Sequence, residues 1–141
     1  MDVPLVCPET NLEESIIQSI LHSLEEAGSR EAVQKTLTVI KKGFVVEYSQ
    51  IMGAFISQDG IRRMEMLIAR YADDYTIIQT ILEILLSLLQ DMNYAIRLDH
   101  NILIGICIQI LLRCKKETSL IKLSLKIIAS LCLYRWCGVF G

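Results

Sequence analysis

IRRMEMLIARYADDYTIIQTILEILLSLL, residues 61–89, decides the fold, because it holds two apolar runs at helical spacing on either side of a short polar break. In both runs the apolar residues recur every three or four positions and so share one helix face. They are Ile61, Met64, Leu67 and Ile68 in the first run, and Ile77, Ile81, Ile84, Leu85 and Leu88 in the second. The stretch therefore predicts two amphipathic helices joined by a tight turn at residues 72–74.

The same pattern returns after 43 residues. This shift places Ile61 on Ile104, Leu67 on Ile110, Ile68 on Leu111, Ile77 on Leu120, Leu82 on Leu125, Leu85 on Ile128 and Leu88 on Leu131. There is also a weaker, earlier copy of the pattern. Leu21 and Leu24 correspond to Met64 and Leu67 at the same shift of 43 residues, and Val33, Leu37 and Ile40 correspond to Ile77, Ile81 and Ile84 at a shift of one residue more. Self-similarity at such a period indicates stacked helical units that stabilise one another.

Working outward from this stretch, the pattern predicts an all-α chain, since strand alternation is nowhere sustained. Helices are expected from an N-cap at Asn11 to Ala27, and from a Ser29 cap to residues 41–43. Others are expected at 44–57, interrupted by Gly53, and at 92–98, 102–114 and 120–131. The expected division is an N-terminal tail (1–11), units at about 12–43, 44–90 and 91–134, and a C-terminal tail (135–141).

A period near 43, built of one short and two longer helices, resembles the armadillo repeat, with the two-helix HEAT repeat as the close alternative. Residues 57–61 look like the turn before the second armadillo helix, and residues 81–88 look like the core of the third. The resemblance implies a right-handed α-solenoid of about three repeats that binds proteins. Ser87 and Ser130 depart from it, because peptide-binding repeats often present asparagine there, and Trp136 lies past the third unit.

The apolar segment 132–141 is unusual at the end of a stack, since solenoids need a polar cap there. Either it folds back over the last helix, or the chain is a truncated piece of a longer array. Truncation is the expectation.

Composition argues against a membrane span. The hydrophobic fraction is 52% and the mean hydropathy +0.43, but the most apolar stretch, residues 102–112, is interrupted by Gln109 and falls short of the roughly 20 residues a bilayer requires. The N-terminus lacks the features of a secretory signal, and the five cysteines form no CxxC pair, so reduced thiols in the cytosol or nucleus are expected. Cys107, Cys114 and Cys132 are expected in the core.

Motifs for chemistry are missing from the sequence. There is no GxGxxG, no GxSxG, and no spacing of His22, His100 and the cysteines that would hold zinc. No enzymatic activity and no metal or other cofactor are therefore expected. A sequence pI of about 5.7 also argues against nucleic-acid binding.

The resemblance implies that the third helix of each repeat lines the binding surface. The 43-residue shift relates Gln79, Glu83 and Ser87 to Lys122, Lys126 and Ser130, each set spaced i, i+4, i+8 on one helix face. Lys35 is the equivalent residue of the first unit. The hypothesis is that these seven residues contact a protein partner through an extended or helical segment bearing acidic residues.

Three alternatives stay open at this level. The seven residues can simply form a solvated face. The chain can be a membrane-surface domain that uses residues 131–140 with Lys122, Lys126 and Arg135, or a compact helical-bundle subunit of a hetero-oligomer. The net charge is also uneven, −6 over residues 1–98 and +4 over residues 99–141, which fits either an oriented partner or an incidental surface.

Overall fold

The computed structural model describes residues 8–46 and 48–140, and the surroundings of side chains at 14–44 and 51–134. The described chain is all-helical, as predicted, and contains no strand in this part. The helices are α1 (Pro8–Glu26), α2 (Arg30–Val46), α3 (Tyr48–Ser57), α4 (Gly60–Arg70), α5 (Tyr75–Leu89), α6 (Met92–Ala95), α7 (His100–Arg113) and α8 (Thr118–Phe140).

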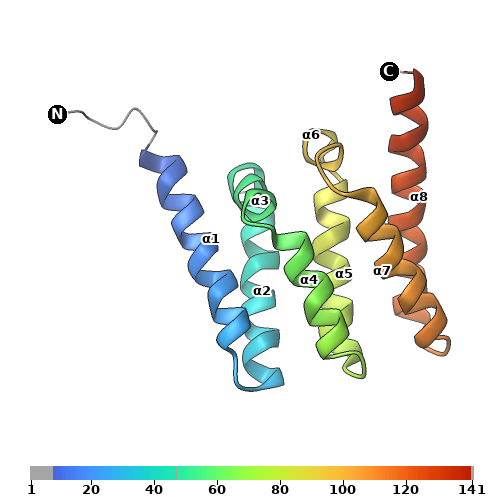
Figure 1. The fold of residues 1–141 in the computed structure, drawn as a ribbon, viewed down its shortest axis with the longest axis horizontal. Coiled ribbons are helices and arrows are strands. Elements are labelled where there is room, and N and C mark those ends of the chain that lie inside the picture. The colour runs from blue at the N-terminus through green and yellow to red at the C-terminus, as the bar shows by residue number, and fades with distance from the viewer. Residues whose placement is uncertain (1–7, 47, 141) are drawn as a thin grey trace.

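The longer helices form two rows (Figure 1). In one row α5 lies between α2 and α8 and packs against both; in the other α4 packs against α7 on one side and meets α1 on the other. The short helices α3 and α6 lie at the same end of the rows and lead into α4 and α7. In two successive units helix length increases along the chain, from 10 to 11 to 15 residues in α3–α4–α5 and from 4 to 14 to 23 residues in α6–α7–α8.

The turns that join the long helices of these units are equivalent. Tyr71 ends α4 with φ −113° and ψ 45°, and Cys114, 43 residues later, ends α7 with φ −110° and ψ 48°. Each donates its N–H over 2.8 Å to the carbonyl oxygen four residues before it, that of Leu67 and of Ile110. The 43-residue register found in the sequence is thus present in the backbone.

The core runs the length of both rows, and α5 is its centre. Ile81, Leu82, Ile84, Leu85 and Leu88 of α5 are completely buried, because this helix has neighbours on both sides and α4 beneath it. Burying such side chains contributes roughly 1.5–3 kcal/mol each. The predicted core positions of the second amphipathic run are confirmed.

The turn before α4 depends on a glycine. Asp59 adopts the left-handed conformation (φ 63°), and Gly60 follows it against the ring of Phe55. A Cβ atom on Gly60 would lie 2.6 Å from that ring. The Phe55 ring is itself buried and packs edge-on against Phe44, with ring centroids 5.3 Å apart. The chain therefore turns sharply between α3 and α4, and the buried Phe55 ring gives a steric reason for the glycine.

Several helix ends differ from the sequence prediction. The first helix begins at Pro8, within the predicted tail 1–11, because proline suits a first helical turn; residues 1–7 lie outside the described part. Helix α2 continues through Gly43 to Val46, so that Phe44 is buried, and α3 passes through Gly53 without a break. Helix α8 continues to Phe140, through the predicted tail 135–141, since no proline or glycine interrupts residues 118–137. Residue 141 and the side chains of 135–140, Trp136 among them, lie outside the description.

Within the described residues, none of the helices combines the length and the apolar character needed to cross a membrane.

Candidate protein-binding surface

The seven residues predicted to bind a partner lie on three adjacent helices, α2, α5 and α8. Lys35 of α2, Lys122 and Lys126 of α8 are exposed, and the remaining four, Gln79, Glu83, Ser87 and Ser130, are half-buried. On α5 these half-buried residues stand on the side opposite the core residues Ile81, Leu85 and Leu88. The seven residues, called the α2/α5/α8 strip below, therefore share the outer side of one helix row.

An ion pair crosses the strip between α2 and α5. Lys41 Nζ lies 2.8 Å from Glu83 Oε1, with both side chains partly exposed. One turn towards the start of α5, the Gln34 amide donates to Thr80 Oγ1 over 2.7 Å, and Thr80 donates in turn to the Thr76 carbonyl. These contacts fix α2 against α5 and neutralise the one acidic residue of the strip.

The three lysines of the strip have no ion-pair partner among the described residues. Lys35, Lys122 and Lys126 form no ion pair within the described part of the chain. By contrast, Arg30 binds Asp73 over 2.9 Å, which raises the pKa of its guanidinium, and Arg63 binds Glu25. Within the described part of the chain, the strip thus combines three lysines that have no ion-pair partner with hydroxyl and amide groups, a composition that attracts carboxylates.

Sequence reasoning missed Lys41 as part of this surface. The Lys41–Lys42–Gly43 run was expected to end the second helix, whereas α2 continues, and Lys41 then faces α5. It also missed the exposed apolar side chains beside the strip, Val39 (53% exposed) and Leu133 (61%). The repeat register could have found them, since Val39 and Leu133 are equivalent to Glu83 and Gln90 on the outer side of α5.

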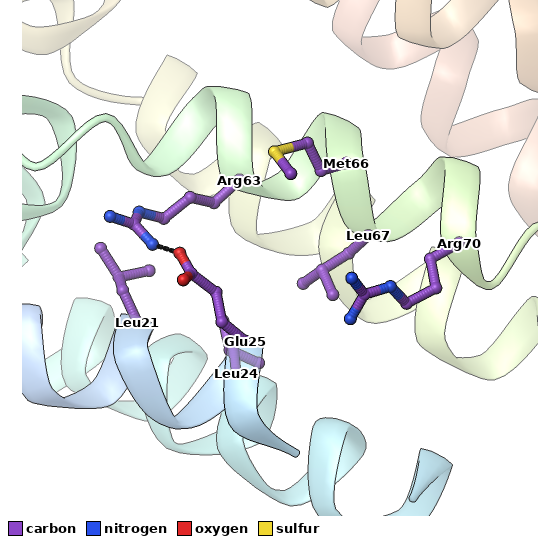
Figure 2. A pocket seen from close by; sticks show the side chains of 7 residues that line it. All are labelled: Leu21, Leu24, Glu25, Arg63, Met66, Leu67 and Arg70. Carbon is purple, nitrogen blue, oxygen red and sulfur yellow. Dashed lines mark ion pairs between the residues drawn. The ribbon is translucent and has the colours of Figure 1, made fainter. Parts of the chain in front are cut away.

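A small cavity lies between α1 and α4, on the other row. Figure 2 shows Leu21, Leu24 and Glu25 of α1 facing Arg63, Met66, Leu67 and Arg70 of α4, with the Arg63–Glu25 ion pair at its mouth. Its volume is about 30 Å³, room for one or two water molecules. It is a packing gap between two units and too small for an organic ligand.

The corresponding gap recurs one unit later. Gln109, Ile110 and Arg113 of α7 line a cavity of about 10 Å³ against Ile68 of α4, and they are equivalent to Met66, Leu67 and Arg70 at the 43-residue shift. The α1–α4 contact therefore repeats as the α4–α7 contact, with the same helix face used each time. This repeated contact relates the first unit, whose sequence pattern is weaker, to the second and third units.

A larger hollow of about 170 Å³ lies between the starts of α4 and α7. Arg62 and Arg97 line it together with Asp59 and Asp99. Asp59 pairs with Arg62 over 3.6 Å, and Asp99 accepts hydrogen bonds from two backbone N–H groups at the start of α7. All four charged side chains are exposed, so the hollow offers balanced charge open to water and no enclosed site.

Two of the three cysteines whose side chains the structure describes are buried. Burial raises the pKa of the Cys107 thiol to about 12, which keeps it protonated and unreactive. Cys114 is buried too, but Cys132 is exposed, so its predicted place in the core is wrong. Its equivalent in α5, Leu89, is covered by α8, and among the described elements nothing covers α8 in the same way.

His22 is exposed, and His100 Nε2 lies 3.0 Å from the Ala95 carbonyl at the start of α7. Among the described residues there is no group of three or more histidine, cysteine or acidic side chains that could hold a metal ion.

Comparison of the chain with protein-family models, with curated proteins and with solved structures finds no match. Function must therefore be inferred from the surface itself.

Proposed function

We propose that this protein is a non-enzymatic interaction scaffold, an armadillo-like right-handed α-solenoid whose α2/α5/α8 strip binds an acidic segment of a partner protein in the cytosol or nucleus. The repeated order of three helices, α3–α4–α5 followed by α6–α7–α8, supports the solenoid part of this proposal. The equivalent turns at Tyr71 and Cys114 support it further. Extended helical stacks expose long continuous surfaces, which suit the binding of linear segments.

The observation that carries the proposal is the set of free lysines at repeat-related positions. Lys35 and Lys122 stand on α2 and α8 at positions equivalent to Gln79 of the central helix α5. Lys126 lies one turn further along α8, where α5 has Glu83, and that carboxylate is already neutralised by Lys41. A ligand crossing the row thus meets positive charge at both sides and neutral polar groups in the middle.

This arrangement selects the chemistry of the ligand. Carboxylates spaced to reach both α2 and α8 would pair with the lysines, while Gln79 of α5 supplies a hydrogen-bonding amide between them and Ser130 supplies a hydroxyl on α8. The apolar side chains Val39 and Leu133 at the edges favour a segment that mixes acidic with apolar residues. Each exposed ion pair contributes up to about 1 kcal/mol, so affinity arises from several pairs and weakens with salt.

Fluorescence anisotropy of a labelled acidic–apolar peptide tests the proposal. The double variant Lys122→Glu/Lys126→Glu should weaken binding at least tenfold, because two attractions become repulsions. Its matched control is Lys115→Glu/Lys116→Glu, which makes the same change of net charge in the exposed turn between α7 and α8. The control should bind within about threefold of the wild type.

Two results would contradict the proposal. Equal losses in both double variants would mean that net charge alone drives binding, and unchanged affinity in the Lys122/Lys126 variant would put the partner elsewhere. A parallel flotation assay with anionic phospholipid vesicles covers the membrane-surface alternative. Flotation that is lost in the Lys122/Lys126 variant, together with no peptide binding, would assign the strip to a lipid surface.

A further inference from the structure

The side of α7 and α8 that points away from α4 and α5 has no described neighbour. The equivalent side of α4 and α5 is the one on which α7 and α8 pack. Leu82 and Ile78 of α5 are buried. Their equivalents on α8 at the 43-residue shift are Leu125, which is 51% exposed, and Ile121, which is half-buried. The difference arises because α5 has α8 beside it, whereas α8 has no corresponding described neighbour.

Apolar residues that are partly or mostly exposed recur at helical spacing on this side of both helices. On α8, Ile121, Leu125 and Ile128 follow the spacing i, i+4, i+7 and so share a helix face. On α7 the same spacing relates Ile104, Ile108 and Leu111. These six residues, none of them fully buried, are called the α7/α8 face.

The opposite end of the array also presents an apolar surface. A hollow of about 230 Å³ lies between α1 and α2, and Ile16, Ile20 and Val39 line it, with Ile16 42% exposed and Val39 53% exposed. Val39 points away from α5, since Gln34 and Lys41 are the residues of α2 that bond to that helix. These three residues define the α1/α2 face.

The two faces differ in charge. Helices α1 and α2 together carry six glutamates against four lysines and arginines, so the α1/α2 end has a net charge of −2, and α1 itself has five glutamates and no lysine or arginine. The turn and helix beside the α7/α8 face carry Arg113, Lys115, Lys116, Lys122 and Lys126 against the single acid Glu117. Two α7/α8 faces brought together would repel, whereas an α7/α8 face meeting an α1/α2 face would bring opposite charges together.

We propose that copies of this chain associate end to end, with the α7/α8 face of one copy packed on the α1/α2 face of the next. The contact continues the geometry already present inside the chain, where α7 and α8 pack on α4 and α5. Such an interface joins two different faces, so it generates head-to-tail dimers and longer assemblies. It leaves the seven residues of the α2/α5/α8 strip open, covers Val39 at the edge of the strip, and does not depend on the function proposed for the strip.

Sedimentation velocity across a range of protein concentrations tests this inference with two single variants. Leu125→Lys disables the α7/α8 face, and Val39→Lys disables the α1/α2 face; both positions are half-exposed, so neither change buries a charge in the core. Met66→Lys is the matched control, an equally exposed apolar residue on α4 in the middle of the array.

Wild type and Met66→Lys should rise above twice the monomer mass of 16.0 kDa as concentration increases. Each face variant alone should stay monomeric, and an equimolar mixture of the two should form 1:1 dimers and nothing larger, because each supplies the face that the other lacks. If circular dichroism shows Leu125→Lys to be unfolded, Ile108→Lys replaces it on the same face.

Three outcomes would overturn the proposal. One is a wild type that remains monomeric at every concentration. Another is a Val39→Lys variant that dimerises alone, which would mean a symmetric contact between α7/α8 faces. The third is a mixture of the two face variants that stays monomeric although the wild type associates.

Discussion

Replacing leucine by alanine at two repeat-equivalent positions should lower the free energy of unfolding by very different amounts. Leu82 on α5 is completely buried, and Leu125, its equivalent on α8, is 51% exposed. A Leu→Ala change in a packed core costs about 2–5 kcal/mol, because it loses the transfer free energy and leaves a cavity. At a half-exposed site no closed cavity forms, and about half of the transfer term is lost, roughly 1 kcal/mol.

Thermal unfolding followed by circular dichroism measures the contrast, at a low protein concentration where association does not contribute. In a chain of this size 1 kcal/mol shifts Tm by about 2–4 °C. Leu82→Ala should therefore lower Tm by about 4–20 °C, and Leu125→Ala by about 2–4 °C. Equal shifts, or a larger one for Leu125→Ala, would refute both the repeat register and the assignment of the uncovered face.

Two further predictions concern the packing of a glycine and the titration of a thiol. Gly60→Ala should destabilise the fold by about 1–3 kcal/mol, since its Cβ would meet the buried Phe55 ring. Gly105→Ala should stabilise the fold by up to about 1 kcal/mol, because it lies within helix α7 and its Cβ would meet nothing within 4 Å. Urea unfolding measures both changes, and a stabilised Gly60→Ala variant would contradict the turn geometry. Because burial raises the pKa of Cys107 from 9.0 to about 12, only the unfolded chain gains free energy by ionising that thiol as pH rises above 9, so stability should fall from pH 9 towards 12. Cys107→Ala should show a shallower fall in the same unfolding titration, and an identical slope would mean that the thiol is not buried in the folded state.

The fold class and the register were predictable because they rest on helical periodicity. The apolar spacing on α4 and α5 survives as the buried side of each helix, whereas on α8 Leu120 and Leu131 are buried and Leu125 is exposed. The cap at Ser29 is present, with its hydroxyl accepting the Ala32 N–H over 3.1 Å. These features are local in sequence, so each is visible in a window of a few turns.

Features that depend on neighbours were not predictable in the same way. Cysteine is usually a buried residue, but Cys132 is exposed because α8 has α5 and α7 as its described neighbours and none on its other side. Likewise Lys41 becomes part of the strip only because α2 continues past the glycine and lies against Glu83, 42 residues away. A single sequence shows which side of each helix is apolar and which is polar. It does not show which helices will lie next to one another.

The most direct test of the proposed binding strip is a map of amide chemical-shift changes by NMR during titration with the acidic–apolar peptide. The largest changes are expected on the outer side of α2, α5 and α8, at Lys35, Gln79, Lys122 and Lys126. Changes that cluster instead around Arg70 and Arg113 on the other row would contradict the proposal.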